Sequence, residues 1–283
     1  MLIASIPSPH SGILNIGPLH IHLYGLTLLV AILACVWLTS YRWKRMGGDP
    51  DLVIRVAVWG VAFGVIGARA YHDLTSWDEV PTPKWKGIFE VWQGGLGVWG
   101  GILLGTLAGW VVVRRSGERF APFMDAAAPG LLLAQGIGRI GNWWNQELFG
   151  KPTNLPWGLE IDPQNRPIDD IEHDTFHPTF LYEALWCFAA AGLLLLIERR
   201  FKGRIRPGGL FALYVLVYSI GRLWIETLRI DPSHEIGGIR LNVFVAAAAI
   251  VLSAAFFVVW QRRWRRGGAR PAKVETMAVP KGR

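Results

Sequence analysis

The sequence predicts an all-α integral membrane protein with seven transmembrane helices, an N-terminus outside the membrane and a cytoplasmic C-terminus. Hydrophobic residues make up 52% of the 283 residues and charged residues 18%, so the composition departs from that of an average soluble domain. Seven apolar segments are long enough to cross about 30 Å of hydrocarbon. The net charge of +8 is concentrated at alternate ends of these segments, which sets their orientation.

Each apolar segment is interpreted as one helix, in order along the chain. The segments cover residues 18–40, 53–71, 96–113, 121–143, 179–198, 208–227 and 241–261. Those at 53–71 and 121–143 are the least uniformly apolar, which favours positions inside a helical bundle over positions facing lipid. We expect no cleavable signal peptide, because the first basic residue, Arg42, follows the first apolar segment.

Basic residues follow the first, third, fifth and seventh segments, whereas the other connections contain fewer of them. The basic stretches contain Arg42, Lys44, Arg45, Arg114, Arg115, Arg119, Arg199, Arg200, Lys202, Arg204, Arg206, Arg262, Arg263, Arg265 and Arg266. By the positive-inside rule these ends face the cytoplasm, and the acidic connection after the fourth segment lies outside. The basic residues therefore reflect membrane orientation, with anionic membrane lipid as their partner. Nucleic acid is not expected, because no recognition motif accompanies the basic residues.

Two connections are long enough to form structure outside the membrane. Residues 72–94 are rich in Pro, Trp and Lys and are expected to lie against the headgroup layer. Residues 144–178 contain many Pro, Asn and Asp residues, which predict a turn-rich cap on the outer face. We therefore expect one membrane domain over residues 1–266 and a disordered cytoplasmic tail over residues 267–283.

The stretch GIGRIGNWWNQELFG, from Gly136 to Gly150, places polar residues at the end of the fourth apolar segment. A guanidinium at the end of a membrane helix is costly without a partner or a function, so Arg139 is a candidate site residue. The glycines around it allow close approach to the backbone, and a lipid phosphate is the simplest ligand that fits both features. The pattern G-x-G-x-x-G also occurs here, but it follows an apolar helix instead of a strand, which argues against a dinucleotide site.

A second polar group lies near the outer end of the sixth segment. Tyr218, Arg222 and Glu226 are spaced four apart and therefore share one helical face. Either Arg222 and Glu226 form an ion pair that neutralises itself, or Arg222 binds an anion that Glu226 orients. Arg139 and Arg222 are expected at a similar depth, where two guanidiniums can clamp a phosphate through charge-assisted hydrogen bonds.

The histidines and cysteines give weaker signals. His173 and His177 are four apart, but no further clustered ligands accompany them, so no metal or cofactor is expected. We interpret His177 and Glu183 as structural hydrogen-bonding groups at the start of the fifth segment, with acid–base chemistry as the alternative. Cys35 and Cys187 lie inside apolar segments without a CxxC pair and are expected to be inert.

Glycines before and within the third segment suggest two different roles. Residues 93–101 are too dense in glycine for packing alone, so backbone that lines a binding site is expected there, with Gly94 and Gly95 in it. The later glycines, spaced four apart, are most simply a helix-packing face. Tyr24, at the start of the first segment, is either an interface tyrosine or a site residue.

The run GRIGNWWNQELFGKP resembles the signature of bacterial phosphatidylglycerol–prolipoprotein diacylglyceryl transferases. The resemblance extends, in order and spacing, over about residues 15–235 and includes the pieces HLYGL, VWQGGLGVWGG, HPTFLYE and YSIGRLWIETLR. It implies a seven-helix enzyme of the bacterial cytoplasmic (inner) membrane whose active site faces the outer leaflet. Such an enzyme transfers the diacylglyceryl group of phosphatidylglycerol to the lipobox cysteine thiol of a prolipoprotein, forms a thioether and releases glycerol phosphate. This reaction is the first step of lipoprotein maturation.

Together with the patterns above, the resemblance assigns candidate site residues. The candidate catalytic residues are Arg139, Arg222, Asn142, Glu147, Glu226 and Tyr24; the candidate substrate-binding residues are Arg139, Asn142, Gly150, Tyr218, His177, Gly94, Gly95, Trp99 and Gly100. One position departs from the family. Many relatives have a histidine, favoured as a catalytic base, where this chain has Trp99. If the chain is active, another group takes the thiol proton, or the thiol loses it to water or to the departing phosphate.

The residues alone leave two other function classes open. A membrane transporter or anion channel also places arginines near glycine-rich helices, although the polar groups here cluster toward the outer ends and not at the midplane. A non-catalytic phosphatidylglycerol-binding subunit would bind the lipid without releasing glycerol phosphate.

Overall fold

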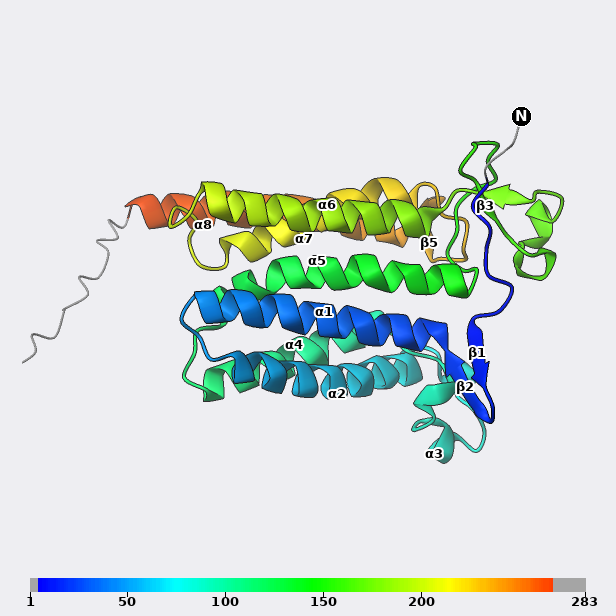
Figure 1. Ribbon diagram of the computed structural model, residues 1–283, viewed down its shortest axis with the longest axis horizontal. Coiled ribbons are helices and arrows are strands. Elements are labelled where there is room, and N and C mark those ends of the chain that lie inside the picture. Colours follow the sequence, from blue (N-terminus) through cyan, green and yellow to red (C-terminus); the bar gives the residue numbers. More distant parts are fainter. Residues whose placement is uncertain (1–4, 267–283) are drawn as a thin grey trace, which may run out of the picture.

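A computed structural model of the chain describes residues 5–266, and its long helices run side by side along the molecule (Figure 1). These helices are α1 (Leu23–Arg45), α2 (Pro50–Thr75), α4 (Val98–Arg115), α5 (Phe120–Trp144), α6 (Thr179–Arg200), α7 (Gly209–Glu226) and α8 (Leu241–Arg266). Each predicted segment corresponds to one of them. Five, namely α1, α2, α6, α7 and α8, are long and apolar enough to cross a membrane. The prediction of a helical membrane protein is confirmed, whereas the number of crossings and their orientation stay predictions.

The first helix begins later than predicted. Residues 18–22 belong to a β-hairpin, in which β1 (Ile13–Ile16) pairs antiparallel with β2 (Leu19–His22). The two strands are joined at Gly17, whose φ of +58° suits glycine. The apolar alternation of the hairpin continues the apolar run of the helix, so composition alone did not separate the two. The predicted disordered tail over 267–283 lies outside the described residues.

Short elements fill the two long connections. Between α2 and α4 lie η1 (Trp77–Glu79), α3 (Lys84–Gly87) and η2 (Val91–Gln93); between α5 and α6 lie β3 (Leu159–Glu160), η3 (Pro163–Asn165), η4 (Ile168–Asp170) and β4 (Thr175–Phe176). A hairpin of β5 (Glu235–Ile236) and β6 (Ile239–Arg240) joins α7 to α8. All of these elements lie at one end of the bundle, which we call the cap end (Figure 1).

Helix α5 lies at the centre of the bundle. It contacts α1 on one side and α6 and α7 on the other, while α2 packs along α4 and α7 along α8. Small residues make the central contacts close: Ala126, Ala128 and Gly136 of α5 are all buried. In the α2–α4 contact, a Cβ added to Gly100 would lie only 2.1 Å from the Gly67 carbonyl oxygen. Small residues let helices approach in this way where apolar burial alone gives little attraction.

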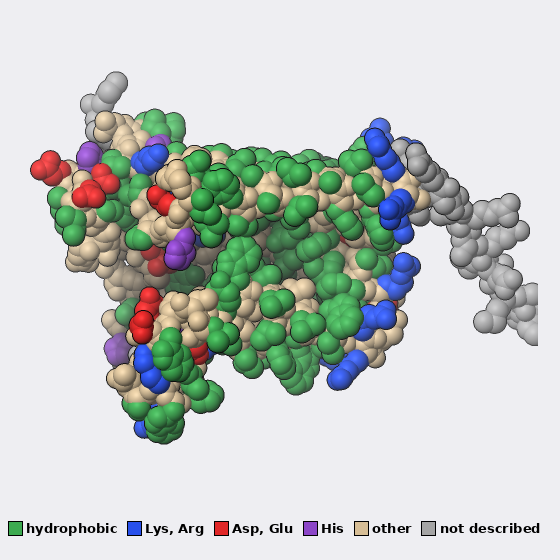
Figure 2. All heavy atoms as spheres, turned by 180° about the vertical axis from the view of Figure 1, so that it is seen from behind, with side chains coloured by type: hydrophobic (Ala, Val, Ile, Leu, Met, Phe, Trp, Pro, Cys, Tyr) green, Lys and Arg blue, Asp and Glu red, His purple; other side chains and the backbone are tan. Residues whose placement is uncertain are grey.

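Side chains are sorted along the bundle axis. Figure 2 shows basic side chains gathered at the end opposite the cap, a broad apolar surface between, and most acidic and histidine side chains at the cap end. Many apolar residues of the long helices are exposed, for example Leu103 at 68% and Leu252 at 69%, as expected for a surface covered by lipid. We call the end opposite the cap the basic end.

Candidate functional site

The cap end of α5 presents Arg139 and Asn142 on one side of the helix. Arg139 donates a hydrogen bond of 3.3 Å to the Asn142 side-chain oxygen. The Asn142 amide in turn donates to Glu147 Oε1 at 2.7 Å, and Asn142 is only 4% exposed. These three residues, all predicted from the signature run, therefore form one hydrogen-bonded group.

A single buried carboxylate, Glu183 of α6, connects this group to α7. Its Oε1 lies 2.9 Å from an Arg139 nitrogen and its Oε2 lies 2.8 Å from an Arg222 nitrogen. The Glu183 side chain is 4% exposed, whereas the arginine side chains are 23% and 16% exposed. One carboxylate between the two guanidiniums thus holds them next to each other.

On α7, Tyr218, Arg222 and Glu226 share one face, as their spacing predicted. The Tyr218 hydroxyl donates to Glu183 Oε1 at 3.4 Å, and Arg222 donates to Glu226 Oε2 at 2.5 Å. The predicted Arg222–Glu226 ion pair is therefore present, but it is not isolated, because Arg222 also binds Glu183. We call Arg139, Glu183, Arg222 and Glu226 the arginine cluster.

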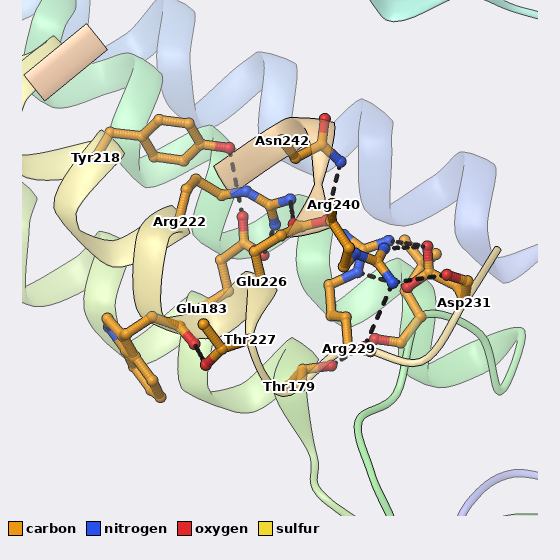
Figure 3. Close-up of polar contacts among 12 residues, drawn as sticks. Thr179, Glu183, Tyr218, Arg222, Glu226, Thr227, Arg229, Asp231, Arg240 and Asn242 are labelled. Atoms are coloured by element: carbon orange, nitrogen blue, oxygen red, sulfur yellow. Dashed lines mark hydrogen bonds and ion pairs between the residues drawn. The ribbon is translucent and has the colours of Figure 1, made fainter. Parts of the chain in front are cut away.

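A second set of polar residues holds Glu226 from the far side (Figure 3). Arg240 of β6 and Asn242 of α8 each donate to Glu226 Oε1 at 2.9 Å. Arg240 also donates to the Asp231 carbonyl oxygen at 2.7 Å, and its guanidinium lies 3.1 Å from Asp231 Oδ2. Arg229 pairs with both carboxylate oxygens of Asp231 at 2.7 and 2.8 Å. The hairpin before α8 is therefore tied to the arginine cluster.

The charges around Asp231 determine its protonation. Burial alone would raise the pKa of Asp231, but the hydrogen bonds and charges of Arg229 and Arg240 outweigh burial and lower that pKa below its usual value. Because the folded carboxyl titrates below the unfolded one, it stabilises the fold at neutral pH. That contribution is lost as the pH falls through the lowered pKa.

The turn after α5 carries backbone strain. Gln146 and Leu148 have positive φ values of 49° and 58°, a region that costs non-glycine residues energy. Gln146 is 4% exposed; its amide donates to the Pro9 carbonyl oxygen and to Asp162, and its oxygen accepts from the Asp162 backbone N–H. These bonds hold the strained turn in the conformation that brings Glu147 back to Asn142.

Gly150 and His177 lie side by side beyond this turn. The Gly150 N–H donates to the His177 carbonyl oxygen at 2.9 Å, and a Cβ on Gly150 would lie 2.9 Å from the His177 Cβ. Glycine is needed there for close approach. The His177 ring nitrogen Nδ1 lies 3.2 Å from the Tyr182 hydroxyl. Burial and the charge of Lys151 lower the pKa of His177, so its imidazole is neutral at pH 7.

Tyr24 of α1 packs on the same end of α5. A Cβ on Gly141 would lie 2.8 Å from the Tyr24 ring, so the glycine of the signature run makes room for this aromatic ring. Tyr24 therefore packs against the residue that precedes Asn142 in α5.

The candidate residues just before α4 and in its first turn form a separate group at the α2–α4 contact. Gly94 and Gly95 have positive φ values, and their carbonyl oxygens accept hydrogen bonds from Arg69 of α2 at 2.7 and 3.4 Å. Gly100 packs against α2. Trp99 is half exposed, and among the described residues no hydrogen bond, ion pair or ring contact joins it to the arginine cluster.

Sequence reasoning missed several residues of this site. Glu183 was interpreted as a structural group, with acid–base chemistry as the alternative. Its position between two arginines of other helices depends on how α5, α6 and α7 pack. Arg240, Asn242 and Asp231 carried no motif at all.

The arrangement suits a phosphate ligand better than a metal. A guanidinium has five N–H donors, so pairing with Glu183 and Glu226 leaves donors on Arg139 and Arg222 for an anion. Within residues 5–266, no group of three or more His, Cys, Asp or Glu side chains is placed to hold a metal ion. Cys35 and Cys187 are free thiols.

Comparison with known proteins gives a consistent result. The family model described as prolipoprotein diacylglyceryl transferase matches residues 11–260. A phosphatidylglycerol–prolipoprotein diacylglyceryl transferase of Bifidobacterium adolescentis is 42% identical over 289 residues, which cover 98% of this chain and 86% of the relative. The protein of that name from Cutibacterium acnes is 46% identical over 265 residues, covering 93% of this chain and 89% of the relative.

Proposed function

The chain belongs to the prolipoprotein diacylglyceryl transferase family, and from that premise we propose that it is a membrane enzyme that transfers the diacylglyceryl group of phosphatidylglycerol to a prolipoprotein. The acceptor is the thiol of the lipobox cysteine. The observation that supports this assignment in the structure is the arginine cluster, in which Glu183 holds two guanidiniums next to each other near the cap end.

In the proposed reaction the thiolate sulfur attacks the glycerol carbon that carries the phosphate ester. A C–S bond forms, the C–O bond to the phosphate breaks, and glycerol phosphate leaves with the electron pair. Donors that are fixed in advance where charge develops are commonly the largest catalytic contribution. Arg139 and Arg222 supply such donors to the phosphoryl oxygens, and their positive charge also favours the thiolate, whose thiol pKa is ordinarily about 8.5.

The neighbouring residues have supporting roles in this proposal. Asn142 orients the headgroup, Glu147 holds Asn142, and Glu226 holds Arg222. Tyr24, Tyr218, Gly150 and His177 line the same end of the bundle. The chain has Trp99 where many relatives have a histidine, so the thiol proton passes to water or to the departing phosphate. Gly94 and Gly95 form the backbone past which the lipid or the peptide approaches.

The proposed membrane arrangement follows from the charges. Seven helices cross the cytoplasmic membrane, the basic end faces the cytoplasm, and the cap end with the arginine cluster faces the outer leaflet. Residues 1–266 form one transferase domain. Phosphatidylglycerol and the prolipoprotein signal peptide then meet at the outer ends of α5, α6 and α7.

The experiment that tests the proposed residues measures the mass of a lipobox peptide incubated with phosphatidylglycerol and purified protein. We expect a mass gain of one diacylglyceryl group on the cysteine for the wild type. Arg139→Ala and Arg222→Ala should each lower the rate by about 10²–10³ while the protein stays folded and inserted. Arg114→Ala, at the exposed basic end of α4, serves as the control. Near-normal turnover in either site variant would exclude the phosphate-binding role.

A further inference from the structure

A groove of about 510 Å³ lies between the basic ends of α6, α7 and α8. It is at the opposite end of the bundle from the arginine cluster, where the basic side chains gather (Figure 2). The proposed transfer reaction uses no residue of this groove, so an inference about it does not depend on the proposed function.

The walls of the groove are apolar. Ile197 of α6, Leu213 of α7 and Phe257 of α8 line it from three different helices. Ile197 and Leu213 belong to the partly buried layer around the core that α5, α6 and α7 share. An apolar hollow at the level of the membrane is suited to a hydrocarbon chain, because burying such surface is favourable at roughly 25 cal/mol per Å².

The mouth of the groove is positively charged. Arg204, between α6 and α7, and Arg262, near the end of α8, both line it. Among the described residues, no hydrogen bond or ion pair engages either side chain. Other arginines at this end do have partners. Arg42 pairs with Glu198, and the Arg206 guanidinium lies 3.5 Å from the centre of the Trp260 ring.

A polar donor without a partner lies beside these arginines. Gln261 lines the groove and accepts a hydrogen bond from the Arg206 backbone N–H at 3.2 Å. Its amide nitrogen, Nε2, is buried and has no hydrogen-bond partner within the described part of the chain. Buried donors in folded proteins rarely lack a hydrogen-bond partner.

We propose that this groove binds one phospholipid with an anionic headgroup. Its acyl chain lies against Ile197, Leu213 and Phe257, and its phosphate lies between Arg204 and Arg262. The ligand must be amphipathic, because the walls are apolar, and it must be anionic, because the two guanidiniums at the mouth have no counter-charge. Guanidiniums bind phosphate oxygens through paired hydrogen bonds, which a point charge does not provide.

The test is native mass spectrometry of the purified full-length protein titrated with phosphatidic acid or with phosphatidylcholine of the same acyl chains. Phosphatidic acid lacks the glycerol headgroup of phosphatidylglycerol, the proposed substrate. We expect the wild type to bind phosphatidic acid more tightly than phosphatidylcholine. Removing both charges in Arg204→Gln/Arg262→Gln should weaken the phosphatidic acid affinity by at least tenfold, since each basic residue near an anionic lipid surface is worth about 1 kcal/mol.

Two variants make the result specific. Arg114→Gln/Arg115→Gln removes two exposed arginines at the same end of the bundle but outside the groove, and should leave the affinity nearly unchanged. Arg204→Lys/Arg262→Lys keeps the charge but loses the paired hydrogen bonds, so its affinity should lie between those of the wild type and the glutamine variant. A folded lysine variant keeps the test informative if the glutamine variant is poorly folded. Equal affinity for the two lipids, an unaffected groove variant, or an equal loss in the Arg114/Arg115 control would overturn the proposal.

Discussion

At the cap ends of α5 and α7, two arginines depend on one buried carboxylate. Glu183 is buried, and leaving a buried charge unpaired costs several kcal/mol. The carboxylate therefore fixes both guanidiniums before a ligand arrives, which is the preorganisation that electrostatic catalysis requires. Glu226 has a similar role one turn beyond Arg222 on α7. It accepts hydrogen bonds from Arg240 and Asn242.

Arg240 is expected to act on catalysis through Glu226 and Arg222. Arg240→Gln should lower kcat by between about tenfold and 100-fold, because small displacements of positioned groups cost that much, while the KM for the peptide changes little. Arg240→Lys should restore part of the rate, since it keeps a cation beside Glu226. The control is Arg55→Gln, which removes an exposed arginine 3.8 Å from Asp49. An unchanged kcat in Arg240→Gln would contradict a positioning role.

Substitution of Trp99 by histidine tests how the thiol loses its proton. Trp99 is half exposed at the start of α4, so an imidazole fits the space, and Trp99→His should transfer at nearly the wild-type rate with the same pH profile. A histidine that served as base would make the rate fall as the ring protonates near pH 6.5. A large gain in rate with that new pH dependence would show that this chain lacks a base which a histidine can supply.

The strained turn between α5 and β3 determines where Glu147 lies relative to Asn142. Gln146→Ala removes three hydrogen bonds and leaves the positive φ in place. We expect a loss of about 1–3 kcal/mol of stability and slower transfer, because Glu147 no longer holds Asn142. Thermal unfolding and initial rates measure the two effects. Gln164→Ala in the exposed η3 is the control; a Gln146→Ala protein with wild-type Tm and rate would contradict this role.

At the level of elements, hydropathy predicted the long helices well and their ends less well. Apolar runs and basic stretches follow from transfer energies, which are local properties of the sequence, so all seven segments correspond to helices. The β1–β2 hairpin was missed because its alternating apolar residues merge with the start of α1. The hairpin of β5 and β6 was missed because strands of two residues leave almost no periodicity. Missing the β5–β6 hairpin matters more than missing the β1–β2 hairpin, because the β5–β6 hairpin places Arg240 in the site.

For the whole molecule, the sequence predicted candidate site residues more readily than it predicted how these residues contact one another. The signature run and the four-residue spacing on α7 identified Arg139, Asn142 and Arg222 without coordinates. Their connection through Glu183 depends on the packing of three helices, which no local pattern encodes. Gly100 was predicted as a substrate-binding residue, and its close contact with α2 shows that a glycine in a rich stretch also serves packing.

The proposed orientation of the bundle is open to a direct test. Cysteines introduced at Asp169 in the cap and at Lys202 at the basic end would be treated with a membrane-impermeant thiol reagent. We expect Asp169→Cys to react in intact cells and Lys202→Cys only after permeabilisation, because basic ends face the cytoplasm. The native Cys35 and Cys187 are half-buried and buried and serve as the background. The reverse labelling pattern would place the arginine cluster in the wrong leaflet for the proposed substrates.

The most direct test of the central assignment is glycerol phosphate release by the purified wild-type protein. The protein would receive phosphatidylglycerol and a lipobox peptide, or the same peptide with its cysteine replaced by serine. We predict release that requires the cysteine and matches the amount of lipidated peptide. Tight phosphatidylglycerol binding without release, or release that is equal with the serine peptide, would contradict thiol transfer and favour a lipid-binding subunit or a lipid hydrolase instead.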